Sequence, residues 1–205
     1  APWVDSIYSY IPVVLNQNIN LTCKYNAEPP PQIDWYFNSN NINIMNDRFK
    51  NVVYYGTRQE NYSEAILAIQ NIQEDNFGDF KCKISNNLGT AEKTIHVSGR
   101  PGPPSLNVTG TTVYWTVQSI DPVLEYKIFY RLPHDDTWQF FKYKRAEKED
   151  QHGDKWMKSE DLSWLDPGVE YQVQLQARNA LGWGSLARSY VTLRLPEKEK
   201  KQIRR

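Results

Sequence analysis

The chain has 205 residues, which is enough for two domains of about 100 residues each. Its 24 lysines and arginines balance its 24 aspartates and glutamates, and without a basic excess there is no reason to expect nucleic acid as the partner. No apolar run approaches the roughly 20 residues that are needed to cross a bilayer, and the first residues lack the basic and apolar segments of a signal peptide.

Short alternating runs recur along the chain at intervals of about 8 to 12 residues, with Asn, Pro, Gly and Asp between them. Helical periodicity is nearly absent, so the pattern predicts an all-β chain built from sandwiches. In the first half we expect strands with one apolar face at 19–23, 33–37, 66–72, 80–84 and 94–97. Period-two alternation then turns Cys23, Trp35 and Cys82 toward the interior.

The segment "SGRPGPP" at 98–104 cannot continue a strand and predicts a domain boundary. We expect a first domain at 1–98, a short linker at 99–103, a second domain at 104–195 and a charged tail at 196–205. The second half has no cysteine and must rely on its hydrophobic core. Its inward residues are predicted to be Val113, Trp115, Val117, Tyr126, Ile128, Tyr130, Val173, Leu175 and Ala177, the last three alternating with Gln172, Gln174 and Gln176.

Two stretches are dense in charge. Residues 142–160 hold 11 charged side chains of both signs; we interpret them as a solvated, mobile hairpin, with a partner-binding loop as the alternative. The tail at 196–205 is interpreted as a disordered stalk. A basic patch beside a membrane is the alternative for the tail.

Three N-x-[ST] triplets begin at Asn20, Asn61 and Asn107. Together with two cysteines that could pair, these candidate glycosylation sites favour the secretory pathway over the cytosol. Two cysteines and scattered histidines cannot complete a zinc site, so we expect neither a metal nor a cofactor.

The first half resembles an I-set immunoglobulin domain in its Cys, Trp, Cys order and in the residues around it. The residues that carry the resemblance are Cys23, Trp35, Leu67, Ile69, Gly78, Cys82, Asn86 and Gly89. The resemblance implies a disulfide between Cys23 and Cys82 that joins the two sheets, with Trp35 packed on it. The second half resembles a fibronectin type III domain, on Trp115, Tyr126, Tyr130 and the run 165–184.

The first half departs from the immunoglobulin pattern at two positions. Phe80 stands where the family usually has the tyrosine of the tyrosine corner, and Tyr171 is the expected counterpart in the second half. Asn76 stands where the family has Asp, with Asp75 beside it. A buried ion pair with Arg48 would therefore become a weaker contact or use Asp75 instead.

An immunoglobulin domain followed by one type III domain is similar to the membrane-proximal part of neural adhesion proteins, the insect Klingon and Wrapper group above all. The junction is also similar to that of fasciclin II and the neural cell adhesion molecule. The resemblance implies non-catalytic adhesion or recognition between neurons or glia, at the extracellular face of the plasma membrane. It implies a cell-surface protein as partner, homophilic or heterophilic, and no small-molecule substrate. We expect a mature or excised part of such a protein, with any anchor outside these residues.

The resemblance also suggests which face meets a partner. Asn20 and Asn61 fall on the same sheet of the immunoglobulin fold, and glycans there would shield it. The opposite sheet would stay open and carries four outward side chains: Asp34, Tyr36, Lys81 and Lys83. The alternative is that these are ordinary solvated strand residues.

Two other functions stay open. The chain could be a spacer that presents more distal recognition domains. It could be a cytokine-type receptor, since "GWGS" at 182–185 would let Trp183 stack on Arg178. An enzyme is not expected, because His96, His134 and His152 are isolated and no catalytic motif is present.

Overall fold

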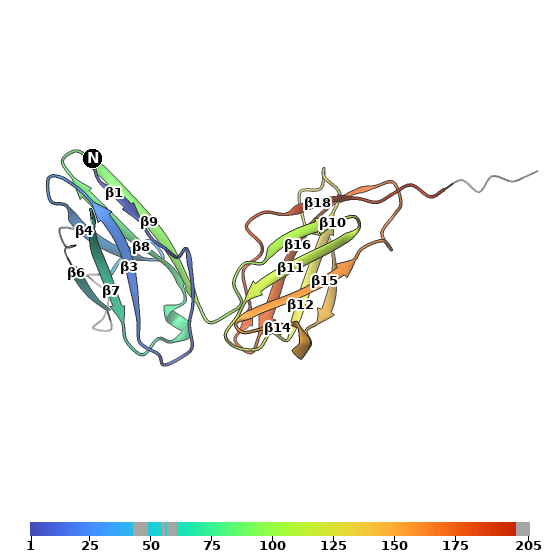
Figure 1. Ribbon diagram of the computed structural model, residues 1–205, viewed down its shortest axis with the longest axis horizontal. Coiled ribbons are helices and arrows are strands. Elements are labelled where there is room, and N and C mark those ends of the chain that lie inside the picture. Colours follow the sequence, from blue (N-terminus) through green and yellow to red (C-terminus); the bar gives the residue numbers. More distant parts are fainter. Residues whose placement is uncertain (43–48, 55, 57–60, 200–205) are drawn as a thin grey trace, which may run out of the picture. The chain divides into compact units, whose positions relative to one another are not determined.

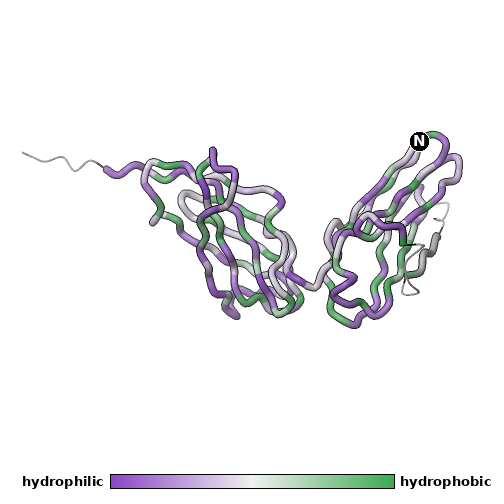
Figure 2. The backbone as a smooth tube through the Cα atoms, turned by 180° about the vertical axis from the view of Figure 1, so that it is seen from behind, coloured by the Kyte–Doolittle hydropathy of each residue, from purple (hydrophilic) through white to green (hydrophobic). Residues whose placement is uncertain are grey.

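The computed structural model describes residues 1–42, 49–54, 56 and 61–199. The chain divides into two compact units, 1–99 and 100–205. Strands make up both units (Figure 1). The backbone alternates between hydrophobic and hydrophilic residues along many of them (Figure 2), as expected for strands with one buried face.

The first unit is a sandwich of two sheets. One sheet has the strand order β1-β3-β7-β6, formed by β1 (Trp3–Asp5), β3 (Ile19–Asn26), β7 (Ser63–Ile69) and β6 (Phe49–Tyr54). The other has the order β2-β9-β8-β4-β5, formed by β2 (Tyr10–Pro12), β9 (Gly89–Ser98), β8 (Gly78–Asn86), β4 (Gln32–Phe37) and β5 (Asn40–Asn41). A 3-10 turn, η2 (Glu74–Asn76), precedes β8. The strand β2 pairs with β9 in parallel, and the other pairs are antiparallel.

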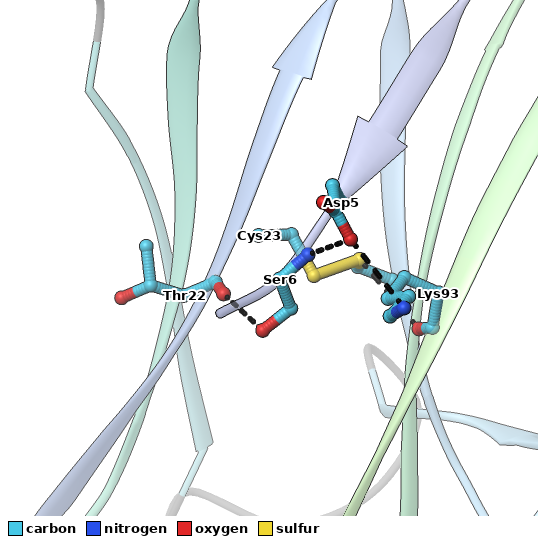
Figure 3. Close-up of a disulfide and its surroundings, with 6 residues drawn as sticks. Asp5, Ser6, Thr22, Cys23 and Lys93 are labelled. Atoms are coloured by element: carbon cyan, nitrogen blue, oxygen red, sulfur yellow. Dashed lines mark hydrogen bonds and ion pairs between the residues drawn. A yellow bond between two sulfur atoms is a disulfide. The ribbon is translucent and has the colours of Figure 1, made fainter. Parts of the chain in front are cut away.

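The centre of the first unit is the bridge between Cys23 on β3 and Cys82 on β8. Both cysteines and Trp35 are fully buried, so the inward positions predicted from alternation are confirmed. Figure 3 shows the disulfide linking the two sheets, beside the ion pair between Asp5 and Lys93 at 3.4 Å. The bridge joins residues 59 apart in the sequence. A crosslink over a loop of that length stabilises the fold by about 4 kcal/mol on the chain-entropy view.

The departures at Phe80 and Asn76 have local explanations. Phe80 is fully buried and packs against the ring of Phe37, with centroids 4.7 Å apart. Asn76 is buried too, and its side-chain oxygen accepts a hydrogen bond from the backbone N–H of Gln73 at 2.9 Å, which closes the turn η2. The expected contact with Arg48 lies outside the described residues.

The second unit is also a sandwich. Its first sheet has the order β10-β11-β15-β14, formed by β10 (Ser105–Thr109), β11 (Thr112–Gln118), β15 (Lys155–Asp161) and β14 (Gln151–His152). Its second sheet has the order β13-β12-β16-β17, formed by β13 (Phe140–Arg145), β12 (Glu125–Arg131), β16 (Glu170–Asn179) and β17 (Gly182–Trp183), and β18 (Val191–Arg194) also pairs with β16. The turn η3 (Lys148–Asp150) precedes β14.

The core of the second unit contains the inward residues predicted from the sequence, of which Tyr130 is only partly buried. The expected tyrosine corner is present: the hydroxyl of Tyr171 accepts a hydrogen bond from the backbone N–H of Asp166 at 3.4 Å. Gln172 and Gln174 alternate with the core residues as predicted but are buried. Gln174 donates a hydrogen bond to the carbonyl of Ala187 at 2.8 Å, because the chain after β17 runs beside β16.

The charged segment 142–160 is exposed to solvent at most of its positions, as expected, but it is not a single hairpin, because it contributes strands to both sheets. The segment supplies most of β13, the turn η3 and nearly all of β14 and β15, and it buries Trp156. Lys142 and Lys144 on β13 both pair with Glu160 on β15, across the two sheets. Burial alone would raise the pKa of Glu160, but hydrogen bonds from the two lysines outweigh it and the pKa is lowered.

A second charge cluster in this segment is more deeply buried. Asp150 is 7% exposed, and its carboxylate contacts Nζ of Lys158 at 3.2 Å. The same carboxylate accepts hydrogen bonds from the backbone N–H of Glu147 at 3.0 Å and from the hydroxyl of Tyr126 at 3.4 Å. Burial alone would lower the pKa of Lys158, but its hydrogen bonds to Asp150 and Glu147 raise it. Opposite charges close in sequence therefore hold η3 against β15.

Candidate partner-binding faces

The four residues proposed for partner binding lie together on the outer face of β4 and β8. Strand register places Asp34 opposite Lys83 and Tyr36 opposite Lys81. The ammonium of Lys81 lies 5.2 Å from the centroid of the Tyr36 ring, and 3.2 Å from a carboxylate oxygen of Glu92 on β9. These four residues therefore lie on one face, as expected from the sequence, and Glu92, which the sequence prediction did not include, lies beside them. Their role in partner binding stays a prediction.

The same face continues to β9 and β2 through His96. Nδ1 of His96 lies 2.7 Å from the Asp79 carboxylate, and its ring stacks on Tyr10 with centroids 6.0 Å apart. His96 therefore lies on the outer face, as its alternation with Ile95 and Val97 indicates. Burial raises the pKa of the Tyr10 hydroxyl above its ordinary value. With Asp79 and Glu92 added, the face carries three carboxylates and two lysines.

The sequons of the first unit lie on its other sheet. Asn20 is exposed on β3, and Asn61 is exposed just before β7; both strands belong to the sheet β1-β3-β7-β6. The geometric basis for an unshielded face on β4, β8 and β9 is therefore present. Whether sugars occupy these sites stays a prediction.

The third sequon borders a shallow hollow in the second unit. Asn107 is exposed on β10, directly opposite Tyr114, which is 47% exposed. The hollow has a volume of about 850 Å³ and also includes Met157 and Ser159. Oδ1 of Asn107 accepts a hydrogen bond from the backbone N–H of Val108 at 3.0 Å.

The stacking contact expected at Trp183 is present. The guanidinium of Arg178 lies 5.8 Å from the Trp183 ring centroid and also contacts Glu125 at 2.9 Å. Strand register places these residues side by side on β16, β17 and β12. The sequence had pointed to this pair alone, although it belongs to a larger group of rings and cations.

Neither metal chemistry nor membrane insertion is indicated by the described part of the chain. Among those residues, no group of three or more His, Cys, Asp or Glu side chains could hold a metal ion. No described helix is long and apolar enough to span a bilayer.

The chain is similar to several known proteins. Residues 2–98 match the immunoglobulin I-set domain. Contactin-5 of Danio rerio is 26% identical over 186 residues, covering 85% of this chain and 17% of its own length. Neural cell adhesion molecule 1 of Mus musculus is 22% identical over 179 residues, covering 82% of this chain and 15% of its own. Lachesin of Drosophila melanogaster is 28% identical over 83 residues, covering 40% of this chain and 22% of its own.

Two consequences follow from the extent of these matches. A match covering more than four-fifths of the chain cannot fit within the first 99 residues, so the similarity to Contactin-5 and to neural cell adhesion molecule 1 reaches into the second unit. The chain spans less than a quarter of each relative's length. Residues 2–98 match the immunoglobulin I-set domain, and the chain is similar to Lachesin, to contactins and to neural cell adhesion molecule 1.

Proposed function

We propose that the chain is part of a non-catalytic ectodomain that mediates adhesion or recognition between neurons or glia. The observation that carries the proposal is the outer face of β4, β8 and β9, which mixes both signs of charge and lies opposite the sheet with two sequons. Homology to Lachesin, contactins and neural cell adhesion molecule 1 supports the same role. We place it at the extracellular face of the plasma membrane, secreted or held by a lipid anchor outside these residues.

We also propose that the second unit is a fibronectin type III domain. Two facing sheets support this, with β10, β11 and β15 in one and β12, β13, β16 and β18 in the other. The tyrosine corner at Tyr171 supports it further. The domain limits are those expected from the sequence, with 99–103 as linker. Glycans at Asn20, Asn61 and Asn107 would then shield one sheet of each domain.

The face of the first unit is suited to self-association. Two copies related by a two-fold axis present the same patch to each other. A patch with carboxylates and lysines side by side can then place Lys81 and Lys83 of one copy against Asp34 and Glu92 of the other. Exposed ion pairs are each worth little, about 0 to 1 kcal/mol. We therefore expect a weak dimer that gains strength when many copies cluster.

Sedimentation of the glycosylated chain tests this, over protein concentrations of about 1 to 100 µM, where weak adhesive contacts are populated. We expect a concentration-dependent dimer that is lost in the variant Lys81→Glu, Lys83→Glu. The matched control is Lys148→Glu, Lys155→Glu, which changes the charge equally at exposed positions of the second unit. A dimer that persists in the variant Lys81→Glu, Lys83→Glu would refute the assignment of the dimer contact to this face. A strict monomer would favour a heterophilic partner or a spacer role.

A further inference from the structure

The outer face of the second sheet in the second unit carries a continuous row of aromatic rings. Phe129 on β12, Phe141 and Tyr143 on β13, and Trp183 on β17 follow one another, with neighbouring centroids 6.4, 5.4 and 6.1 Å apart. We call these four residues the aromatic row. Phe141 is 49% exposed and Tyr143 is 50% exposed. Such large apolar side chains on a solvent-facing surface indicate a contact site when they lie together.

The ammonium of Lys127 on β12 lies over the aromatic row. It lies 4.8 Å from the centroid of Phe129, 4.3 Å from that of Phe141 and 5.5 Å from that of Tyr143. Three rings around one ammonium hold it in place by cation–π attraction. Contact with the rings leaves the outward side of the ammonium free to donate hydrogen bonds.

A second cation on the same strand is held in a similar way. The guanidinium of Arg131 lies 4.1 Å from the Trp138 centroid and 5.7 Å from that of Tyr190, and its Nε donates a hydrogen bond to Gln172 at 2.8 Å. Where β12 pairs with β13 and β16, the outward positions hold four cations but one carboxylate, Glu125. The four cations are Lys127, Arg131, Arg145 and Arg178.

Three of those cations have no acidic neighbour. Arg178 contacts Glu125. Among the residues that the structure describes, no carboxylate lies within ion-pair distance of Lys127, Arg131 or Arg145. The lysines on the inner side of β13 are instead both paired with Glu160. Both lysines on the inner side of β13 therefore have an acidic partner, whereas three of the four cations on the outer face have none among the described residues.

We propose that this face binds an acidic segment of a partner protein, whose carboxylates reach Lys127, Arg131 and Arg145 while its apolar side chains pack on the aromatic row. Charge complementarity determines the choice of partner. Another copy of the same face is unsuited, because a two-fold contact would set four cations against four. The third sequon, Asn107, lies on the opposite sheet of this unit, so a glycan there leaves the face open.

The proposal is tested by panning a library of random peptides, each about a dozen residues long, against the immobilised glycosylated chain. We expect the enriched peptides to be rich in Asp and Glu together with apolar residues, and their binding to weaken with salt. Lys127→Glu and Tyr143→Ala should each reduce binding of an enriched peptide by about tenfold or more, as for hot-spot residues.

The opposite sheet offers matched controls. Lys155→Glu makes the same charge change at an exposed position, and Tyr114→Ala removes a tyrosine that is 47% exposed, against 50% for Tyr143. Neither control should change binding. Circular dichroism verifies that each variant is folded. If Tyr143→Ala folds poorly, Tyr143→Ser replaces it. Lys127→Glu tests the same face independently of Tyr143.

Four results would overturn the proposal. The enriched peptides could lack acidic residues, or bind equally well to Lys127→Glu. The library could yield no binder, while heparin binds to the chain and no longer binds to Lys127→Glu. That result would make a sulfated polysaccharide, rather than an acidic peptide, the ligand of this face. Sedimentation could show a dimer that Tyr143→Ala disrupts, and a second copy of the chain would then be the partner that binds this face. Lys81 and Lys83 are unchanged in these experiments, so failure here is distinct from failure of the proposed function.

Discussion

Replacing Lys158 by Met should destabilise the second unit while leaving the first unchanged. The ammonium of Lys158 lies 3.2 Å from the Asp150 carboxylate, and Asp150 is 7% exposed. Removal of one partner from a buried ion pair costs about 3 to 5 kcal/mol, because the remaining charge stays buried. Here the carboxylate keeps hydrogen bonds from the backbone N–H of Glu147 and from Tyr126. We therefore expect a loss of about 2 to 3 kcal/mol, at or below the lower end of that range.

Urea unfolding followed by tryptophan fluorescence can report this loss selectively, because five of the seven tryptophans lie in the second unit. With a denaturant slope of about 1 to 3 kcal/mol per molar for a small domain, the midpoint should fall by roughly 1 to 2 M. Lys155→Met is the matched control: it makes the same substitution on the same strand at an exposed position, and should leave the midpoint unchanged.

The double variant Asp150→Asn, Lys158→Met separates loss of the pair from loss of the lysine's packing. An amide oxygen can still accept the hydrogen bond from Glu147 without a buried charge, so the double variant should be more stable than Lys158→Met alone. A Lys158→Met midpoint equal to that of the control would refute the reasoning. A double variant less stable than the single variant would also refute it, since the penalty would then not arise from a stranded carboxylate.

Three further outcomes are expected. Tyr171→Phe removes the acceptor of the hydrogen bond from the Asp166 N–H and should reduce the free energy of unfolding by about 1 kcal/mol, measured as a lower urea midpoint. An unchanged midpoint would show that the tyrosine corner does not stabilise the domain. Gly184→Ala should reduce the free energy of unfolding by up to about 3 kcal/mol and lower the melting temperature, because a Cβ at this position would lie 1.9 Å from the carbonyl oxygen of Pro101. A melting curve equal to that of the wild type would contradict this. Folding lowers the pKa of Glu160 below its ordinary value of 4.5, so the stability that Glu160 contributes is present above pH 4.5 and is lost as the pH falls below that value. In Glu160→Gln the urea midpoint should therefore fall less steeply on acidification than in the wild type. An equally steep fall in the variant would contradict this role of Glu160.

Alternation alone was enough to predict the centre of the first unit. A strand turns successive side chains to opposite faces, so one buried residue fixes the orientation of its neighbours. Cys23, Trp35 and Cys82 were therefore predicted inward, and all three are fully buried. The patch of Asp34, Tyr36, Lys81 and Lys83 followed from the same rule combined with the immunoglobulin resemblance, which supplied the pairing of β4 with β8.

The strands and ion pairs of the charged segment were not predicted, because they depend on contacts that a linear pattern does not contain. Lys142 and Glu160 lie on strands of different sheets, and Asp150 meets Lys158 only because η3 folds against β15. A dense run of both signs is usually a solvated surface. Here the alternate apolar position at Trp156 was the signal that one face of the run is buried.

The aromatic row was missed for a related reason. Its rings come from three strands, and their separation in the sequence exceeds 50 residues between Phe129 and Trp183. Each ring taken alone is an ordinary strand residue. Only the register of β12 with β13 places Lys127 among three rings, and only the pairing of β16 with β12 and β17 adds Trp183 to the row.

The two faces should differ in what they bind because their charges differ. The face on β4, β8 and β9 carries Asp34, Asp79 and Glu92 beside Lys81 and Lys83, so it can complement a copy of itself. The face on β12, β13 and β16 has four outward cations and one carboxylate, so it repels a copy of itself and attracts an acidic surface. Salt weakens both contacts. Charge reversal in the first unit should affect self-association alone, and charge reversal in the second unit should affect binding of an acidic partner alone.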